Sequence, residues 1–368
     1  MRTQWTKEQA WEWYKSQPWI RGFNGYPQNC VNRIAMWQAH NHEAVIKQIE
    51  QEFILAKATG LNAVRAILQF EVWYYEHDSF MANLEEYLTL ADRYGIKVML
   101  CLGNDCTVPK DDWRPVVFGE QNVDWGWHSG IRKGPHAKGY RAPGYMMADD
   151  PAILPEYYKM VDELAAKYAK DPRIHIWDVW NEIGNGRRGE MSVPYMEAFF
   201  EIIRSHDPIQ PLTADCYHYS ADMEVETPQE LRALALSDII TFHYYGSYQN
   251  MIKLIEFLKG YGRPLINNEW LNRITKNRVE ELFPLFYLEG IGSYHWGLIQ
   301  GYSQTYEPWG RYFDQIADPD YAGELELTLL QHDLYRFNGL PYIAKEIAVM
   351  QDFAKRADER FERGEWLK

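Results

Sequence analysis

Cysteine is scarce in this sequence, and so are long apolar runs. Four cysteines in 368 residues, at positions 30, 101, 106 and 216, are too few and too scattered for a disulfide framework, so we expect all four to be reduced. Charged residues interrupt the segment 1–19, and no apolar run of signal-peptide or membrane length follows it. The sequence therefore predicts a cytoplasmic protein that does not bind membranes.

Positive charge is also in short supply. Lysine and arginine number 38 against 52 aspartates and glutamates, which gives a formal net charge of −14. Nucleic acids and anionic membranes are bound largely through clustered lysine and arginine, so this balance argues against both as partners. A neutral substrate fits the charge better.

Two further signatures are missing. No Gly-x-Gly-x-x-Gly follows the first apolar run, so a doubly wound dinucleotide-binding sheet is only the second choice of fold. The histidine pairs, such as His40 and His42, lack the partners of a metal site. We expect neither a catalytic metal nor another cofactor.

Aromatic residues are abundant, with 15 tryptophans and 26 tyrosines. Both side chains carry a polar group that needs a partner when buried, so many of them are expected to line a cleft. Flat rings in a cleft can stack on the apolar faces of sugars, and plain packing is the alternative use.

Apolar runs typical of strands alternate with amphipathic segments along the chain. Strands are predicted at 20–25, 62–68, 97–103, 174–182, 211–216, 238–245, 264–270 and 291–300. Helices are predicted at 43–59, 81–94, 156–169, 195–205, 229–236, 251–258, 276–289 and 342–353. This alternation predicts an α/β protein, a (β/α)8 TIM barrel in a single domain over residues 1–368.

Two connections are far longer than ordinary links between a strand and the next helix. They span 104–150, after the third strand, and 302–339, after the eighth. Both contain tryptophans, among them Trp125 and Trp309, and we expect them to wall a pocket at the carboxyl ends of the strands. Packing on the outside of the barrel is the alternative.

Two acids stand where predicted strands stop. Glu182 ends the run at 174–182, and Glu269 is the next-to-last residue of the run at 264–270. The fourth and seventh strands of a barrel meet at one central mouth, so these acids are expected to converge there. Two facing carboxyl groups are the equipment for glycoside hydrolysis, at about 5–5.5 Å for retention or roughly 6.5–9.5 Å for inversion.

At this point the chain resembles the clan A glycoside hydrolases, and most closely glycoside hydrolase family 5. The resemblance covers nearly the whole chain and rests on an ordered set of residues at strand ends. These are Arg65 in the second strand, Asn181 and Glu182 in the fourth, His243 and Tyr245 in the sixth, Glu269 in the seventh and Trp296 in the eighth.

The resemblance implies a role for each residue of this set. Glu182 would be the general acid/base and Glu269 the nucleophile. Asn181 would donate to the sugar 2-hydroxyl, Trp296 would form the floor under the ring, and His243 would hold a hydroxyl or Glu182 itself.

The chemistry of the pair supports the same assignment. Two carboxylates this close cannot both ionise easily, so one pKa should rise. If Arg65 and Tyr245 lie beside Glu269, they favour its charged form and leave Glu182 as the group that holds the proton.

Other polar side chains near the strand ends are further candidates for sugar contacts. The family usually has a histidine at the end of strand three, whereas this sequence has Asn104 and Asp105 there, and either of them is a candidate replacement. Asn24 near the first strand end and Glu71 after the second are also candidates. Asp178 lies inside the fourth strand and is expected to be a buried acid paired with a barrel arginine or lysine.

The long aromatic loops favour closure of one end of a groove and therefore exo action. The motifs Gly-Phe-Asn-Gly-Tyr at 22–26 and His-Asp-Leu-Tyr-Arg-Phe at 332–337 are similar to subfamily 18 of family 5. That subfamily resembles β-mannosidases that cut mannosyl-β-1,4-N-acetylglucosamine. The resemblance implies a retaining exo-β-mannosidase acting on an oligosaccharide.

Three alternatives remain open at this stage. The enzymatic rivals are an endo-β-1,4-glycanase of the cellulase or mannanase type, and a β-xylosidase or β-glucosidase. The non-enzyme rival is a carbohydrate-binding barrel that has lost catalysis.

Overall fold

The computed structural model describes residues 2–130 and 142–367 and contains one eight-stranded parallel sheet. Every predicted strand overlaps an observed one. The strands are β1 (Arg21–Asn24), β2 (Ala63–Ile67), β3 (Lys97–Asn104), β4 (Ile174–Asn181), β5 (Leu212–Ala214), β6 (Ile240–His243), β7 (Leu265–Trp270) and β8 (Gly292–His295).

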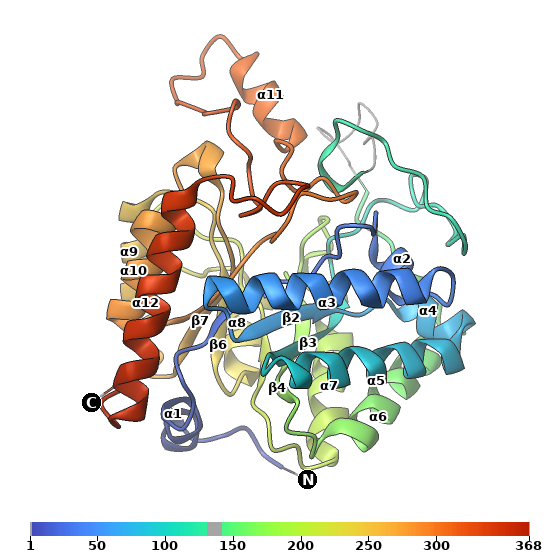
Figure 1. The fold of residues 1–368 in the computed structure, drawn as a ribbon. Coiled ribbons are helices and arrows are strands. Elements are labelled where there is room, and N and C mark those ends of the chain that lie inside the picture. The colour runs from blue at the N-terminus through green and yellow to red at the C-terminus, as the bar shows by residue number, and fades with distance from the viewer. Residues whose placement is uncertain (1, 131–141, 368) are drawn as a thin grey trace.

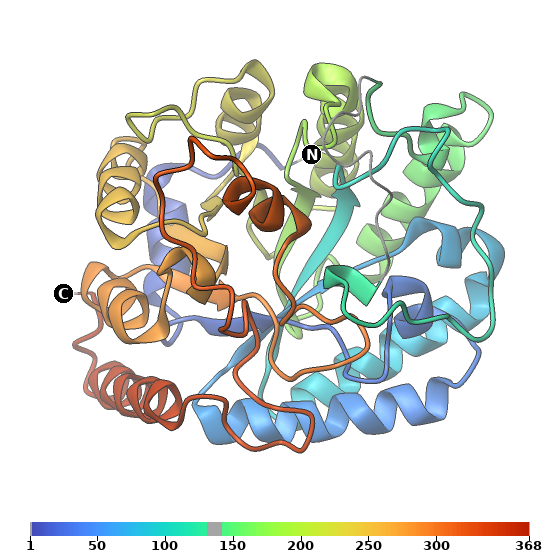
Figure 2. The ribbon, with the colours of Figure 1, turned by 90° about the horizontal axis from the view of Figure 1, so that it is seen from above.

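The sheet closes into a barrel. Its order is β5-β4-β3-β2-β1-β8-β7-β6, and the parallel bridge between Cys216 and Phe242 joins the two ends. Seen from above, the strands form a ring inside a circle of helices (Figure 2). The predicted (β/α)8 TIM barrel is confirmed.

The helices lie mainly outside the sheet, and each predicted helix overlaps an observed one. The α-helices are α1 (Lys7–Lys15), α2 (Arg33–Trp37), α3 (His42–Thr59), α4 (Phe70–Tyr75), α5 (His77–Arg93), α6 (Leu154–Tyr168), α7 (Val193–Ser205), α8 (Pro228–Leu236), α9 (Tyr248–Lys259), α10 (Val279–Glu289), α11 (Gly310–Ile316) and α12 (Ala344–Glu362). Short 3-10 turns occur at His128–Gly130, Met147–Asp149, Gly189–Ser192 and Arg273–Thr275.

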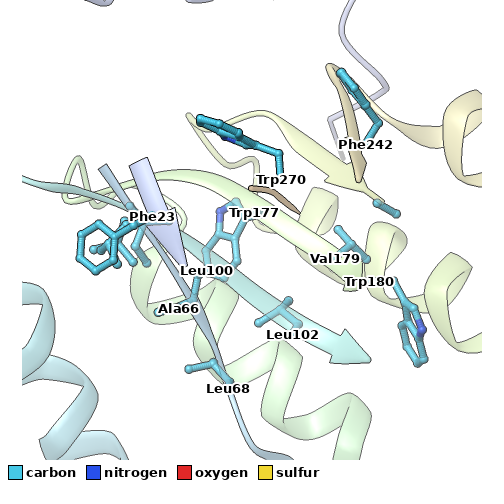
Figure 3. Close-up of a cluster of buried hydrophobic side chains, with 14 of the residues drawn as sticks. Phe23, Ala66, Leu68, Leu100, Leu102, Trp177, Val179, Trp180, Phe242 and Trp270 are labelled. Carbon is cyan, nitrogen blue, oxygen red and sulfur yellow. The ribbon is translucent and has the colours of Figure 1, made fainter. Parts of the chain in front are cut away.

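The main core fills the layer between the strands and the helices. Side chains of a strand alternate between its two faces, so residues two apart, such as Leu100 and Leu102 of β3, point the same way. Figure 3 shows these two with Ala66 and Trp177 in the buried cluster. Complete burial of such a leucine contributes about 1.5–3 kcal/mol. The outward positions thus hold the helices, and the inward positions are left for the barrel interior.

A smaller apolar cluster closes the bottom of the barrel. Inward-facing Met99, Ile176 and Ile266 meet Ala10 and Tyr14 of α1 there. The helix α1 lies below the strands in Figure 1, opposite the long loops. With one end filled by apolar side chains, polar groups inside the barrel collect at the other end.

The two strands that carry the acids both contain an irregularity. Between the pairs Asp178–Thr213 and Trp180–Ala214, β4 has one residue more than β5. In the same way, β7 has an extra residue between its pairings with Phe242 and His243 of β6. An extra residue in one strand bends it and re-aims the side chains that follow. These irregularities therefore set the direction of the residues at the ends of β4 and β7.

The two long connections contact each other above the barrel. Residues 105–153 join β3 to α6, and residues 296–343 join β8 to α12 and include α11 (Figures 1 and 2). Gln304 of the second loop accepts from the amide of Gly126 over 2.6 Å and donates to the carbonyl of Asp124 over 2.8 Å. Nε1 of Trp309 lies 3.1 Å from Nε2 of His128. The loops are thus held together by partly buried polar contacts.

No helix within residues 2–130 and 142–367 is both long and apolar enough to cross a membrane.

Candidate active site

Glu182 and Glu269 face each other at the carboxyl ends of β4 and β7. Glu182 follows the last residue of β4 and has a φ of 48°, a left-handed conformation that is costly for a residue other than glycine. Glu269 lies within β7 and is 6% exposed. A carboxylate oxygen of one lies within 4.8 Å of a carboxylate oxygen of the other. The predicted convergence of the two acids is therefore what the structure shows.

The carboxylate of Glu182 is held by three neighbours. Its Oε1 lies 2.8 Å from Nδ1 of His243, and its Oε2 accepts from the Cys106 thiol over 2.9 Å. The side-chain amide of Asn185 also donates to Oε2. These contacts fix both oxygens at the mouth of the barrel.

Different neighbours hold Glu269. The guanidinium of Arg65 donates to Oε1 over 2.7 Å, and the hydroxyl of Tyr245 donates to Oε2 over 2.7 Å. Nδ1 of His243 lies 3.5 Å from the same Oε2. His243 therefore stands between the two acids.

Arg65 is the central cation of the site and is completely buried. Besides Glu269, it donates to Asp178 over 2.6 Å and to Asp215 over 2.7 Å. It also donates to the side-chain oxygens of Asn181 over 2.7 Å and of Asn24 over 3.0 Å. The predicted pairing of Asp178 with a barrel cation is confirmed. Arg65 also fixes the positions of Glu269 and Asn181 by donating hydrogen bonds to both.

The protonation order differs from our expectation. Burial opposes the charged form of Glu182, but the hydrogen bond and charge of His243 outweigh it and lower the pKa of Glu182. Burial raises the pKa of Glu269, against the opposing charges of His243 and Arg65. The prediction that Glu182 has the raised pKa was wrong, because it considered only the two acids, Arg65 and Tyr245 and left out the charge of His243.

The proton resides on His243 instead. Burial disfavours the imidazolium, but the negative charges of Glu269 and Asp215, and the hydrogen bonds to Asp215 and Glu182, raise the pKa of His243 to about 10. Nε2 of His243 lies 3.3 Å from Oδ2 of Asp215. In the free site the histidine is therefore positively charged, and Glu182 is its ion-pair partner.

The pKa values of the two buried aspartates that contact Arg65 are also shifted in opposite directions. Burial and the nearby charge of Asp215 raise the pKa of Asp178 to about 7. Burial opposes ionisation of Asp215 as well, but Arg65 and His243 lower the pKa of Asp215 below its ordinary value. Asp215 is thus the ionised partner of Nε2 of His243.

The other predicted residues fall into two groups, of which the first lies at the carboxyl ends of the strands, where Asn181 and Asn24 accept from Arg65. Nδ2 of Asn181 donates to Asn104 over 2.8 Å, so Asn104 orients Asn181. Asn24 is buried: its amide donates to the carbonyls of Asn268 and His295, and its side-chain oxygen accepts from Arg65. Trp296, which follows β8 directly, is half-buried.

The second group lies outside the strands, with Glu71 in α4 and Trp125 in the loop after β3. Glu71 is half-buried and accepts from Gln69. Trp125 is 58% exposed, and its ring packs 5.7 Å from that of Tyr302 and 6.3 Å from that of Phe337. Asp105 turns away to Ser192 and Arg188, so it does not take the place of the missing histidine.

Sequence reasoning missed three residues that contact the acids or their partners. Asp215 directly follows β5, and the rule that selected Glu182, an acid at a strand end, would have found it. Cys106 and Asn185 lie in loops after β3 and β4 and contact Glu182. Nothing in their local sequence indicates this, because the contacts depend on how the two loops fold toward each other.

Within the described residues, Glu182, His243 and Glu269 also form one group whose ligand atoms could surround a metal ion. The guanidinium of Arg65, 2.7 Å from Glu269, opposes a cation at this position. The charged His243 has no lone pair to offer a metal. The group therefore suits proton transfer better than metal binding.

Several solved structures share the fold. A variant of a subfamily 18 protein of family 5 from Streptomyces cattleya, in complex with Manβ1-4GlcNAc, has a TM-score of 0.59 at 14% identity, over 92% of this chain and 81% of that chain. An exo-β-1,4-mannosidase from an Opitutaceae bacterium has a TM-score of 0.56 at 15% identity over 95% of this chain. This chain covers 60% of the length of that enzyme.

An endo-β-1,4-mannanase from Thermotoga petrophila is similar to the same degree, with a TM-score of 0.56 at 17% identity, over 96% of this chain and 78% of that chain. No curated protein matches the sequence. Residues 21–316 match the family described as Cellulase (glycosyl hydrolase family 5). Since this match spans most of the chain, the protein belongs to glycosyl hydrolase family 5 and is a glycoside hydrolase.

Proposed function

We propose that the protein is a retaining, exo-acting β-mannosidase that hydrolyses β-1,4-mannosyl linkages, such as the one in mannosyl-β-1,4-N-acetylglucosamine. The observation that carries the mechanism is the short gap between Glu182 and Glu269, with carboxylate oxygens within 4.8 Å. Retention needs carboxyl groups about 5–5.5 Å apart, whereas inversion needs a wider gap that admits a water. The gap supports double displacement.

Glu269 is the proposed nucleophile. Arg65 and Tyr245 occupy one lone pair on each of its oxygens and hold the carboxylate toward the gap. Attack on the anomeric carbon forms a glycosyl ester and neutralises the carboxylate. Burial that raises the pKa of Glu269 also favours the loss of its charge in this step.

Glu182 is the proposed acid/base, and His243 supplies its proton. In the free site the pair is charged, with Nδ1 of His243 2.8 Å from Oε1 of Glu182. A sugar that fills the gap expels water, and loss of water favours the neutral pair over the ion pair. The proton then resides on Glu182, from which it passes to the leaving oxygen, and the same carboxylate takes a proton from water in the second step.

The remaining polar groups are proposed to hold the sugar. One N–H of Asn181 is engaged by Asn104, and the other faces only the sulfur of Cys106 over 3.4 Å, a weak acceptor. The 2-hydroxyl of a sugar can replace that sulfur contact. Trp296 is proposed as the floor under the ring. We assign Glu71 and Trp125 to more distant parts of the substrate.

Contact between the two long loops supports exo action. Gln304, completely buried, ties the second loop to the backbone at Asp124 and Gly126 of the first. Two loops joined above the barrel favour a groove closed at one end, which accepts a chain terminus and not an internal linkage. The solved complex of a subfamily 18 protein with Manβ1-4GlcNAc supports that disaccharide as the substrate.

The endo-mannanase from Thermotoga petrophila has the same fold, so an endo-acting glycanase is the second candidate. Aryl β-glycosides that differ only in the sugar test which sugar is preferred, and we expect mannoside to be hydrolysed faster than glucoside and xyloside.

Reducing-end-labelled β-1,4-manno-oligosaccharides test whether the enzyme acts at the chain end or within the chain. Release of mannose alone from the unlabelled end supports exo action, and mixed labelled oligomers from the first minutes would replace it by endo action.

Glu182→Ala tests the two-step scheme. This variant should retain the first step on aryl glycosides with good leaving groups, and azide should restore turnover and yield the β-glycosyl azide. An α-azide product would contradict retention.

The free thiols support the cytoplasm as the proposed location. Cys30, Cys101, Cys106 and Cys216 are unpaired, as expected of a protein in a reducing compartment.

A further inference from the structure

The thiol of Cys106 contacts the proposed acid/base, Glu182, although the mechanism above gives this thiol no role. It is the second residue after β3, and its backbone N–H donates to the side chain of Asn104 over 2.9 Å. Its Sγ lies 2.9 Å from Oε2 of Glu182, and the side-chain amides of Asn181 and Asn185 lie 3.4 and 3.3 Å from the same sulfur. The thiol is thus the common contact of these three side chains.

The donors on Glu182 are unevenly divided between its two oxygens. An ionised carboxylate offers about two lone pairs on each oxygen. Cys106 and Asn185 both donate to Oε2 and fill it, whereas Oε1 has the single contact with His243. Oε1 is therefore the oxygen with a free lone pair for the glycosidic oxygen and later for water.

The thiol suits this position because it donates weakly and stays protonated. Cys106 is exposed in part, but burial of its thiol among its neighbours and the charge of Glu182 raise the pKa of Cys106 well above its ordinary value. A protonated thiol can donate to Oε2 but does not take the proton that catalysis needs. Because a thiol is a weaker donor than an amide or a hydroxyl, the bond orients the carboxylate while lowering its basicity only modestly.

We infer that Cys106 is a positioning residue for the acid/base: its thiol, together with Asn185, occupies Oε2 of Glu182 and leaves Oε1 to exchange the proton with the substrate. This inference rests on the proposed role of Glu182. It assigns to the loop after β3, where the usual histidine is missing, a part in proton transfer.

Cys106→Ala removes the donor and leaves the rest of the loop in place. Glu182 then loses a contact that stabilises its charged form, so the basic limb of the kcat/KM profile should move to higher pH. Oε2 can then compete with Oε1 for the proton, so kcat for glycosides with poor leaving groups should fall roughly three- to tenfold. Activated aryl glycosides, which need little protonation, should lose much less.

Cys106→Ser restores a hydroxyl donor and should return both the pH profile and the dependence on leaving group toward wild type. Cys30→Ala deletes a buried thiol outside the site and serves as the matched control. Thermal unfolding of all three variants identifies any loss of fold. Rescue by serine and not by alanine supports the inference.

An equal loss of activity in Cys106→Ala and Cys106→Ser would overturn the inference about Cys106. So would an unchanged pH profile and leaving-group dependence in Cys106→Ala.

The variant Glu269→Gln distinguishes failure of this inference from failure of the proposed function. If that variant is inactive, the two-acid mechanism stands whatever Cys106 does. If it is fully active, the proposed function itself fails.

Discussion

Nδ1 of His243 lies 2.8 Å from Oε1 of Glu182, and this contact decides where the proton of the free enzyme resides. Two carboxylates and one imidazole share the site, and the imidazolium satisfies both acids at once. The pair of His243 and Glu182 thus stores the proton that the leaving group requires.

We predict that His243→Gln narrows the pH range of activity. The pKa of His243 is raised to about 10, so the stored proton is kept through neutral pH, and the wild-type basic limb should lie well above pH 8. Without the imidazole Glu182 alone must hold the proton, and the limb should move down by roughly one pH unit or more. The measurement is kcat/KM against pH, with His206→Gln at the surface as the control. An unmoved limb would rule out proton storage on His243.

Arg65→Met should destabilise the protein strongly. It leaves Asp178, Asp215 and Glu269 without their shared cation in a buried site, and breaking such a cluster costs roughly 3–5 kcal/mol. The loss should diminish at acidic pH, where the carboxylates become protonated. Urea unfolding at pH 7 and pH 4.5 measures it. Arg21→Met, which breaks a pair with the half-exposed Asp358, should cost less, and equal losses would contradict the central role of Arg65.

Gln304→Ala should loosen the contact between the two long loops. Both hydrogen bonds from its amide to the backbone at 124–126 are lost, so the closed end of the groove should open. We expect products longer than a monosaccharide from manno-oligosaccharides, with cleavage of the disaccharide reduced. Gln351→Ala removes a comparable bond, from α12 to the carbonyl of Ala58 in α3, that involves neither loop, and it should leave the products unchanged. If Gln304→Ala still released mannose alone, the contact between the two loops would not be the cause of exo action.

Glu52→Gln should stabilise the protein more at pH 8 than at pH 4.5. Burial raises the pKa of Glu52 to about 7 in the folded protein, above the value of about 4.3 expected for the unfolded chain. The unfolded state therefore releases this proton first, and folding stability falls as pH rises from about 4.5 to about 7. Removal of the titration should gain on the order of 1–3 kcal/mol at pH 8. Urea unfolding tests this, with exposed Glu12→Gln as the control, and a gain that is equal at both pH values would refute it.

The sequence was sufficient for the barrel and for the residues at its strand ends. Apolar runs and amphipathic segments indicated the eight strands and eight of the helices, although α1, α2, α4 and α11 were not predicted. Regular alternation of strands and helices leaves few architectures other than the barrel. Glu182, Glu269, Arg65, His243 and Tyr245 converge because parallel strands in a barrel bring their carboxyl ends to one mouth.

The finer geometry could not be predicted. The extra residues in β4 and β7 decide which way the strand ends point, and they appear only in the pairing with neighbouring strands. The order of the pKa values depends on the contact between His243 and Glu182, which the resemblance implied only as one of two alternatives, and on the charge that Glu269 and Asp215 keep on His243. Cys106 reaches Glu182 through loop packing, a long-range feature without a local sequence signal.

The central claim is that Glu269 attacks the anomeric carbon while Glu182 faces the same carbon across the gap. An activated 2-deoxy-2-fluoro-β-mannoside should trap the glycosyl-enzyme, because the fluorine slows its hydrolysis more than its formation. Peptide mass mapping of the trapped protein should place one sugar on Glu269. A sugar on Glu182, or turnover with inversion and no trapped ester, would contradict the account.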